Sequence, residues 1–158
     1  MKRLFIKAPS GRQRFNVLGA LNAMSKEVIT VCNDTYINSL SVCELLLKLR
    51  ELYPDTLISL VLDNARYQRC HLVMNKAKEL GIELVFLPPY SPNLNLIERL
   101  WKFTKKKCLY SKYYAKFGDF KVAIKDCVVN GHIKYKEELD SLLTHNFQTF
   151  DNTQIITV

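Results

Sequence analysis

LISLVLD, residues 57–63, is a nearly continuous apolar run that ends in an aspartate. Such a run is typical of a central strand covered on both faces, and it predicts that Asp63 stands at the carboxyl end of that strand. Open α/β sheets place ligands and functional groups at this end of their strands. Asp63 is therefore a candidate functional residue, although a strand-end aspartate is more often a turn former or a helix cap.

The residues after Asp63 predict a helix and a second buried strand. We expect the helix from about residue 68 to residue 80, because Gly81 is a residue that ends helices. The run IELVFL, residues 82–87, has the apolar pattern of a strand and stops at two prolines. Strands joined by helices in this order predict an α/β fold with a mixed sheet covered by helices.

The loop PPYSPNLN, residues 88–95, leads from this strand into a helix expected over about residues 94–108. Its prolines restrict the backbone, and Asn93 or Asn95 can cap the helix. The loop therefore holds the helix at a fixed angle. Two roles remain as alternatives for this loop: a purely structural corner, or a direct contact with DNA.

Glu98 lies in the first turns of that helix. One interpretation is an exposed carboxylate that pairs with Lys102 one turn later. On a helical wheel, however, Glu98 falls between a face for burial (Leu94, Ile97, Leu100, Trp101 and Thr104) and a basic arc (Arg99, Lys102 and Lys106). A carboxylate at the rim of a core, beside a basic arc, is well placed for a metal ion that meets phosphate.

Asp63 and Glu98 follow consecutive elements of one sheet layer, so their side chains can converge. Two hard oxygen donors suit Mg²⁺ or Mn²⁺, which keep several waters and take substrate phosphates as further ligands. Two such ions can activate the attacking oxygen and stabilise the leaving oxygen in phosphoryl transfer, and that chemistry normally uses a third carboxylate. Asn64 can orient a carboxylate or a phosphate, with an exposed turn residue as the equal alternative.

The amino-terminal part of the chain predicts two neighbouring strands and a helix. The strands are expected over residues 15–23 and 28–32, where apolar and β-branched residues gather. The helix begins at Asn38 or Ser39 as its cap and ends before Pro54, with apolar residues at helical spacing (Val42, Leu45, Leu46, Leu49 and Leu52). One face of this helix is for burial.

The carboxyl-terminal part predicts two further helices. Asp119 can cap a helix that runs to Val129, and residues 134–143 can form another. The sequence of residues 145–158 does not clearly predict a helix or a strand. We expect one domain over residues 1–158, with a core over about residues 11–108 and a basic helical extension over about residues 109–158.

Composition predicts a soluble globular protein. The 158 residues are 48% hydrophobic and 24% charged, as expected for one domain that buries most of its apolar side chains. No run reaches the roughly eighteen apolar residues that a bilayer span needs, and the first nine residues lack a signal-peptide core. Five cysteines stand singly, which favours reduced thiols in a structural role over a zinc site or a disulfide framework. The cytoplasm is the expected location.

The formal charge of +8 favours a polyanionic partner. Residues 99–125 hold nine basic residues against one acid, and a second basic stretch lies near the amino terminus. The candidates for DNA contact are Arg99, Lys102, Lys105, Lys106, Lys107 and Lys112, with Arg12 and Arg14. One interpretation of lysines 105–107 is a solvated helix end that complements the helix dipole. We favour a surface that binds the phosphate backbone, because further lysines and tyrosines follow in the sequence (Tyr110, Lys112, Tyr113, Tyr114 and Lys116). Trp101 is interpreted as a core residue rather than a base-stacking platform.

Three runs resemble signatures of one enzyme family. VLDNARYQRC (residues 61–70) and FLPPYSPNLNLIERLWKFTKKK (residues 86–107) resemble the second-Asp and Glu signatures of DDE transposases, most closely the mariner-like superfamily and its bacterial insertion-sequence branch. RQRFNVLGALN (residues 12–22) resembles the strand that precedes them in that branch. The runs occur in the family's order, with 34 residues between Asp63 and Glu98, and the resemblance covers about residues 11–126.

The resemblance implies an RNase H-like fold in which Asp63 is the second catalytic Asp, Glu98 is the catalytic Glu, and Mg²⁺ or Mn²⁺ is the cofactor. The family's first Asp lies upstream of the run that begins at Arg12, where this sequence has eleven residues without Asp or Glu. We therefore expect a domain truncated at its amino terminus, without the first strand and the first metal ligand. Asp34, at a turn position in the family pattern, is a poor substitute.

The resemblance also implies a function. A transposase of this kind cuts DNA at insertion-sequence ends and joins it to target DNA by metal-dependent phosphoryl transfer, and we expect this chain to have impaired or no activity alone. The alternatives are a catalytically dead DNA-binding or interaction remnant and an RNase H-like nuclease of other specificity. The expected partners are transposon ends, target DNA and a second copy in a homodimer, in the bacterial cytoplasm at the nucleoid.

Overall fold

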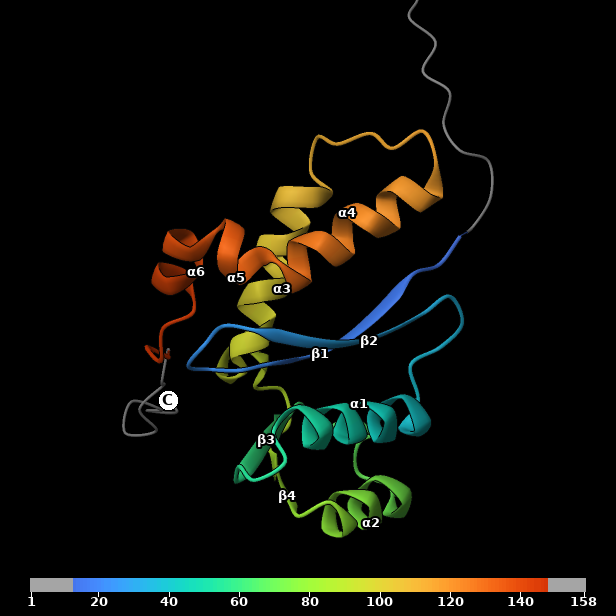
Figure 1. Ribbon diagram of the computed structural model, residues 1–158, viewed down its shortest axis with the longest axis vertical. Helices are drawn as coiled ribbons and strands as arrows, with labels where there is room; N and C mark the ends of the chain where they lie inside the picture. Colours follow the sequence, from blue (N-terminus) through green and yellow to red (C-terminus); the bar gives the residue numbers. More distant parts are fainter. Residues whose placement is uncertain (1–12, 148–158) are drawn as a thin grey trace, which may run out of the picture.

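The structure is a computed structural model that describes residues 13–147 of the chain. Strands and helices alternate through the first two thirds of these residues, and helices alone follow (Figure 1). In chain order the elements are β1 (Asn16–Leu21), β2 (Val28–Asn33), α1 (Ser39–Leu52), β3 (Ile58–Leu62), α2 (His71–Glu79), β4 (Ile82–Phe86), a 3₁₀ turn η1 (Pro92–Leu94), α3 (Leu96–Cys108), α4 (Phe117–Val129), α5 (Gly131–Lys134) and α6 (Lys136–Leu142).

The strands pair in both orientations. β1 and β2 form an antiparallel hairpin in which Asn16 lies opposite Asn33, and β3 and β4 are parallel, with Ile58 opposite Ile82. The predicted α/β class is therefore confirmed. Backbone hydrogen bonds within residues 13–147 divide the strands into two two-stranded sheets rather than one continuous sheet.

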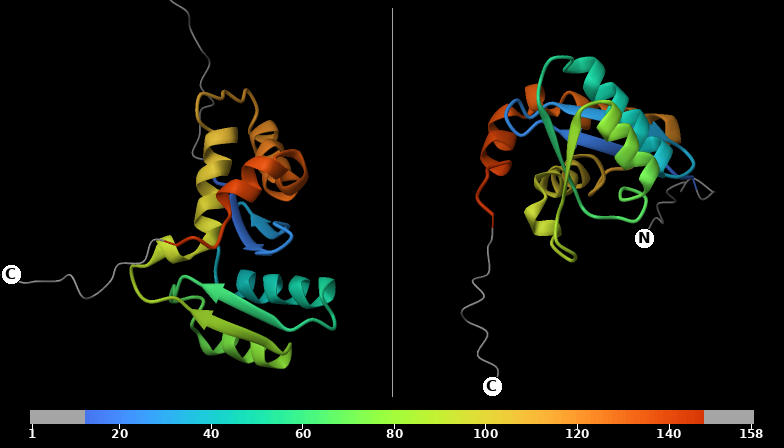
Figure 2. Two further views of the ribbon diagram at one scale, coloured as in Figure 1. Left: turned by 90° about the vertical axis from the view of Figure 1, so that its left-hand side faces the viewer. Right: turned by 90° about the horizontal axis from the view of Figure 1, so that it is seen from below.

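Helix α1 joins the two sheets through a shared apolar core. Asn38 caps the helix in a capping box: its side chain accepts from the Ser41 amide at 3.1 Å, and the Ser41 hydroxyl accepts from the Asn38 amide at 3.3 Å. One face of α1 packs against α2 and both sheets (Figure 2). The buried residues of this cluster are Ala20, Val31, Val42, Cys43, Leu45, Leu46, Leu49, Val73, Ala77 and Ile82. The predicted burial of one face of this helix is confirmed.

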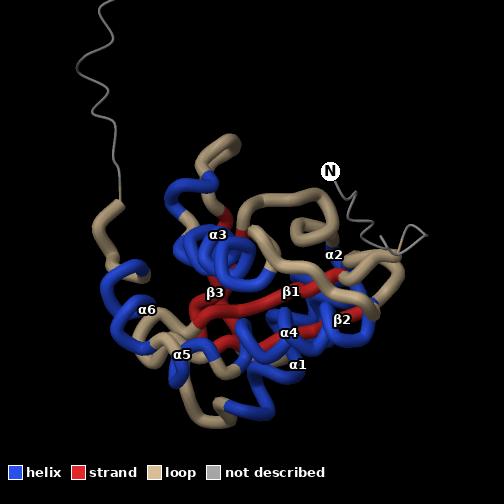
Figure 3. The backbone as a smooth tube through the Cα atoms, turned by 90° about the horizontal axis from the view of Figure 1, so that it is seen from above, coloured by secondary structure: helices blue, strands red, loops and turns tan. Residues whose placement is uncertain are grey.

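A second core fills the opposite side of the β1–β2 hairpin. Leu100 and Phe103 of α3 pack there with Ile124 and Val128 of α4 and with Leu139 of α6. Helices therefore lie on both sides of β1 and β2, with α3 and α4 on one side and α1 on the other (Figures 1 and 3). Because the same helix α3 carries Glu98, this core also positions a candidate site residue.

Gly19 of β1 lets α3 approach the hairpin closely. A β-carbon added at Gly19 would lie 3.0 Å from the Cη2 atom of Trp101 and 3.2 Å from a methyl carbon of Val28. Only a residue without a side chain leaves room for the indole there. Trp101 thus packs at the helix–sheet interface, in agreement with its interpretation as a core residue.

The prediction that β3 is covered on both faces is wrong. Ile58, Leu60 and Leu62 point into the core, but Val61 is 45% exposed, and Val85 beside it on β4 is 40% exposed. In residues 13–147, α1 and α2 cover one face of this pair. An apolar run alone cannot distinguish a strand buried on both faces from one that leaves some apolar side chains in solvent.

Two helices begin at other residues than predicted. α2 begins at His71 and not near residue 68, because the Gln68 side chain accepts from the Ala65 amide at 3.0 Å and closes a turn first. α4 begins at Phe117, so Asp119 is a first-turn residue and not the cap. A carboxylate there still interacts favourably with the helix dipole.

The last predicted helix, residues 134–143, is found as α6, and a short helix that was not predicted, α5, precedes it. α5 ends at Lys134 and α6 begins at Lys136, with Tyr135 between them outside the α-region. The Tyr135 ring packs edge-on against Phe103 of α3, with 5.4 Å between ring centroids. No helix within residues 13–147 is both long and apolar enough to cross a lipid bilayer.

The five cysteine thiols are free, and their structural role stays a prediction. Cys43, Cys108 and Cys127 are buried. Burial raises the pKa of the Cys127 thiol to about 12, with the neighbouring Cys108 as the next cause. Cys127 is therefore protonated and unreactive near neutral pH.

Candidate functional site

The site is built at the carboxyl end of β3. Asp63 follows the last strand residue, Leu62, and is exposed. Asn64 has a left-handed backbone with φ of 75°, a conformation that asparagine tolerates better than most residues. Its Oδ1 atom is buried without a hydrogen-bond partner within residues 13–147. A buried amide oxygen without a partner is costly in free energy, which makes it a ready ligand for a cation.

The loop after β4 brings the start of α3 to the same place. The Leu87 amide donates to the Leu62 carbonyl at 2.9 Å, so both strands end together. The chain then turns through Tyr90, with φ of 60°, and through η1 before α3 begins at Leu96. Prolines in this loop restrict its backbone, so the helix enters at a defined angle.

Asn95 links the two elements through one side chain. Its Oδ1 atom accepts from the Ile97 amide at 3.4 Å and so caps α3, which settles the choice between Asn93 and Asn95. Its Nδ2 atom donates to the Asp63 carboxylate. The Asn95 side chain is only 8% exposed, and both bonds are partly buried. The first turn of α3 is thereby held against the carboxylate that follows β3.

Glu98 stands in this first turn. Its amide donates to the Asn95 carbonyl at 3.2 Å, and the side chain is partly buried. Within residues 13–147 its carboxylate has no ion-pair partner, so the alternative of pairing with Lys102 is not formed. Three residues of an α-helix rise by only about 4.5 Å. Glu98 therefore lies within one helical turn of Asn95, the residue that bonds to Asp63.

The donor atoms of the candidate residues suit a hard divalent cation. They are the carboxylates of Asp63 and Glu98 and the unpartnered amide oxygen of Asn64. Mg²⁺ and Mn²⁺ prefer oxygen ligands and complete their coordination with water and substrate phosphates. Within the described part of the chain, no three His, Cys, Asp or Glu side chains gather closely enough to hold a metal ion. The chemistry of Asp63, Glu98 and Asn64 therefore suits part of a metal site, and their role as ligands stays a prediction.

Tyr67 is a neighbour of the site that sequence reasoning missed. Burial raises the pKa of its hydroxyl, and the negative charge of Asp63 raises it further. The Tyr67 hydroxyl therefore stays protonated at neutral pH, close enough to Asp63 to sense its charge. The sequence shows only that Tyr67 lies four residues after Asp63, and this spacing alone does not predict that the two side chains are neighbours.

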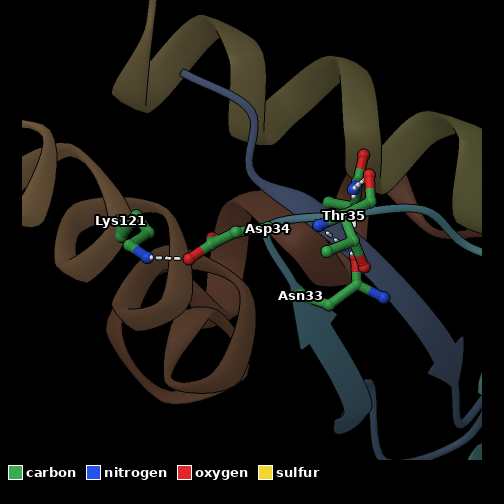
Figure 4. A network of polar contacts seen from close by, with 5 residues as sticks. Asn33, Asp34, Thr35 and Lys121 are labelled. Atoms are coloured by element: carbon green, nitrogen blue, oxygen red, sulfur yellow. Dashed lines mark hydrogen bonds and ion pairs between the residues drawn. The ribbon is translucent and has the colours of Figure 1, made fainter.

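Asp34 belongs to a different part of the molecule. Its carboxylate forms an ion pair with Lys121 of α4 at 2.6 Å (Figure 4). The preceding residue, Asn33, accepts from the Asn16 side chain at 3.0 Å and from the Thr35 amide at 3.2 Å. Asp34 lies in the bend after β2, the turn position expected for it, and its ion pair links this bend to α4.

The basic residues proposed to contact DNA fall into two groups. Lys102, Lys105, Lys106 and Lys112 are exposed and form no ion pair within residues 13–147. Arg99 instead donates to the carbonyls of Leu142, Thr144 and Asn146 at 3.2, 2.8 and 2.6 Å. These bonds tie the segment after α6 to α3, and they leave Arg99 with fewer donors for a phosphate.

Lys107 and Arg14 also have intramolecular partners. Lys107 pairs with Glu138 at 2.7 Å and lies 4.8 Å from the centre of the Tyr135 ring. The guanidinium of Arg14 lies 4.8 Å from the centre of the Tyr36 ring. Arg12 is outside the described residues. The exposed lysines of α3 and the loop after it are therefore the strongest candidates for contact with phosphate.

Replacing Asn95 by alanine is expected to destabilise the fold by about 1–3 kcal/mol, because it removes a helix cap and a buried bond to a carboxylate. Urea unfolding measures the loss. Asn95→Ser is the matched control, because serine can still cap the helix but is too short to reach Asp63. Equal stability of the alanine variant and the wild type would contradict the linking role of Asn95.

Comparisons with known proteins give a family and a fold. The family described as DDE superfamily endonuclease matches residues 2–121. The catalytic core domain of BIV integrase is similar in structure, with a TM-score of 0.55 and 21% identity over 82% of this chain and 93% of that chain. A chain in the structure of the simian T-cell lymphotropic virus intasome in complex with the PP2A regulatory subunit B56 gamma gives a TM-score of 0.54 and 14% identity over 87% of this chain and 51% of that chain. No curated protein sequence matches. The predicted RNase H-like fold class is confirmed.

Proposed function

Since the chain belongs to the DDE superfamily endonuclease family, we propose that it cuts and rejoins DNA at insertion-sequence ends by metal-dependent phosphoryl transfer. One observation carries this proposal at the level of residues. The Asn95 side chain caps the helix of Glu98 and bonds to Asp63. This link between the two elements supports the placement of the two acidic residues of the family signatures at one rim of the fold.

Each residue of the site has a separate task in this proposal. Asp63 and Glu98 hold Mg²⁺ or Mn²⁺, and Asn95 orients Asp63 through the bond from its Nδ2 atom. Asn64 offers its buried Oδ1 atom as a further oxygen at the same rim. The bound metal supplies activation of the attacking oxygen and stabilisation of the leaving oxygen. The protonated Tyr67 hydroxyl can donate to a phosphate oxygen near Asp63.

The DNA lies along the exposed lysines of α3 in this proposal. Lys102, Lys105 and Lys106 present unpaired charges, and Lys112 extends the row into the loop after the helix. Such contacts hold the phosphate backbone without reading bases. The substrates would be the transposon ends and the target DNA, bound by a homodimer at the bacterial nucleoid in the cytoplasm.

A second candidate function is DNA binding without cleavage. Within residues 13–147 no three His, Cys, Asp or Glu side chains gather to hold a metal ion, whereas metal-dependent strand transfer normally uses three carboxylates. A site with two carboxylates would bind metal more weakly and position the nucleophile less well, which costs orders of magnitude in rate. The candidates differ in one assay: the first predicts nicking of insertion-sequence ends with Mn²⁺ that Glu98→Gln abolishes, and the second predicts salt-sensitive binding without nicking.

Titration with Mg²⁺ or Mn²⁺ is expected to raise the melting temperature of the wild type. At a metal concentration ten times Kd the stabilisation is about 1.4 kcal/mol, or roughly 3–6 °C for a domain of this size. Asp63→Asn should remove most of this shift, because it replaces a charged ligand by a neutral one. The measurement is a thermal melt at constant ionic strength.

The matched control for this titration is Asp55→Asn. Asp55 is an exposed aspartate in the turn before β3, and its replacement should leave the metal response as in the wild type. An unchanged response in Asp63→Asn would count decisively against Asp63 as a ligand.

A further inference from the structure

A hollow of about 330 Å³ lies where the loop after α3 leads into α4. It is separate from the Asp63–Glu98 rim, since it adjoins the opposite end of α3. Its size is at the lower end of the range for small-molecule pockets, which is about 300–1,000 Å³. The side chains that give it chemical character are Lys112, Tyr113, Tyr114, Lys116, Phe117 and Phe120. The hollow can thus hold one nucleotide-sized group but not a duplex.

The aromatic wall of the hollow is fixed by its own contacts. Phe117 and Phe120 stack with 5.6 Å between ring centroids and 21° between planes, and Tyr114 meets Phe120 edge-on at 5.7 Å. The Tyr114 hydroxyl donates to the Cys108 carbonyl at 2.7 Å, which anchors this ring to the end of α3. Lys121 lies 5.2 Å from the Phe117 ring centre. Rings held in this way present an apolar face without a large entropic cost on binding.

Lys112 and Lys116 are exposed and give the hollow a positive rim. They belong to the segment of residues 99–125, which carries nine basic residues against one acid. A neutral aromatic ligand would gain little from this charge. A ligand with an aromatic face and a phosphate uses both features, and single-stranded nucleic acid is bound in this way, with bases stacked on rings and phosphates beside cations.

The location of the hollow relates it to the proposed site. Glu98 and Cys108 lie in the same helix, and ten residues of helix span about 15 Å. In B-form DNA this distance corresponds to about four or five base steps at 3.4 Å per step. Base faces are hidden inside a duplex, so only an unpaired base can reach the rings.

We propose that the hollow formed by Lys112, Tyr114, Lys116, Phe117 and Phe120 binds one unpaired nucleotide of the DNA, about four or five positions from the scissile phosphate. This inference rests on the proposed function for its substrate class. The base stacks on the Phe117 and Tyr114 wall, and its phosphate lies between the two lysines. The chain thereby favours DNA with a single-stranded tail over a fully paired duplex.

The test compares two labelled oligonucleotides by fluorescence anisotropy with the full chain at fixed salt. One is a blunt duplex, and the other carries a six-nucleotide single-stranded tail. Base stacking on one aromatic residue contributes about 1–3 kcal/mol, so the tailed DNA should bind at least about fivefold more tightly. Phe117→Leu keeps the apolar volume but removes the ring, and should bring the ratio of the two affinities close to one.

Tyr110→Leu is the matched control. Tyr110 is an exposed tyrosine of the same loop that does not line the hollow, so its replacement should keep the wild-type ratio. A 2-aminopurine base in the tail should change its emission on binding the wild type but not Phe117→Leu. Circular dichroism of each variant checks folding.

Any one of three results would overturn the inference. Equal binding of blunt and tailed DNA by the wild type would show that no unpaired nucleotide is held, while salt-sensitive duplex binding would leave the proposed function intact. An equal loss of the ratio in Phe117→Leu and Tyr110→Leu would show that the hollow is not the site. Absence of all DNA binding would overturn the proposed function together with this inference.

Discussion

Replacing Lys102, Lys105 and Lys106 together by glutamine is expected to lower the affinity for duplex DNA by at least about tenfold at moderate salt. The three ammonium groups are exposed and form no ion pair within residues 13–147, so each is available to a phosphate. Every phosphate contact contributes about 0.9 to the slope of log affinity against log salt. The wild type should therefore lose roughly 40-fold more affinity than the variant between 50 and 200 mM salt.

Anisotropy titrations at four salt concentrations measure this effect. The control variant replaces Lys48, Lys78 and Lys136 by glutamine, which removes the same charge from other helices. Two of these lysines are in exposed i,i+4 ion pairs, Lys48 with Glu44 and Lys136 with Asp140, whose loss costs little stability. If both triple variants changed affinity and salt slope alike, net charge rather than the surface of α3 would be responsible.

Leu46→Ala is expected to lower the free energy of unfolding by about 2–5 kcal/mol, a larger loss than that expected for Asn95→Ala. Leu46 has no exposed surface and lies in the core that α1 shares with both sheets. The cavity left by alanine would loosen the contact between the β1–β2 and β3–β4 pairs at the same time. Urea unfolding monitored by circular dichroism gives the change in the free energy of unfolding.

Leu47→Ala is the control for this substitution, with the same chemical change one position later. Leu47 is 41% exposed on the same helix, so its truncation should cost well below about 2 kcal/mol, since it leaves no enclosed cavity. Comparable losses in the two variants would contradict the assignment of Leu46 to a shared core.

Local features of the fold followed from the sequence. The apolar spacing in α1 and the capping role of Asn38 depend on residues within a few positions of each other, and the structure confirms both. Helix starts were less accurate where a side chain formed a competing turn, as Gln68 does with the Ala65 amide. The exposure of Val61 and Val85 could not be predicted, because it depends on which helices cover a sheet.

In the candidate site, too, local features could be predicted from the sequence, but contacts between distant residues could not. Asp63 and Glu98 were identified from short runs and their order, and their roles as ligands stay predictions. Asn95 was proposed as a cap, but its bond to Asp63 joins residues 32 apart in sequence. The contact of Arg99 with carbonyls 43–47 residues later was equally hidden. Such pairings require the three-dimensional arrangement, because no local pattern encodes the partner.

The bare backbone of Gly19 beneath Trp101 has a practical consequence. Trp101 is the single tryptophan of the chain and belongs to the helix that bears Glu98. The wavelength and intensity of its fluorescence emission therefore report on how that helix packs against the β1–β2 hairpin. Binding of a cation or an oligonucleotide that shifts the helix can be followed in solution without attaching a dye.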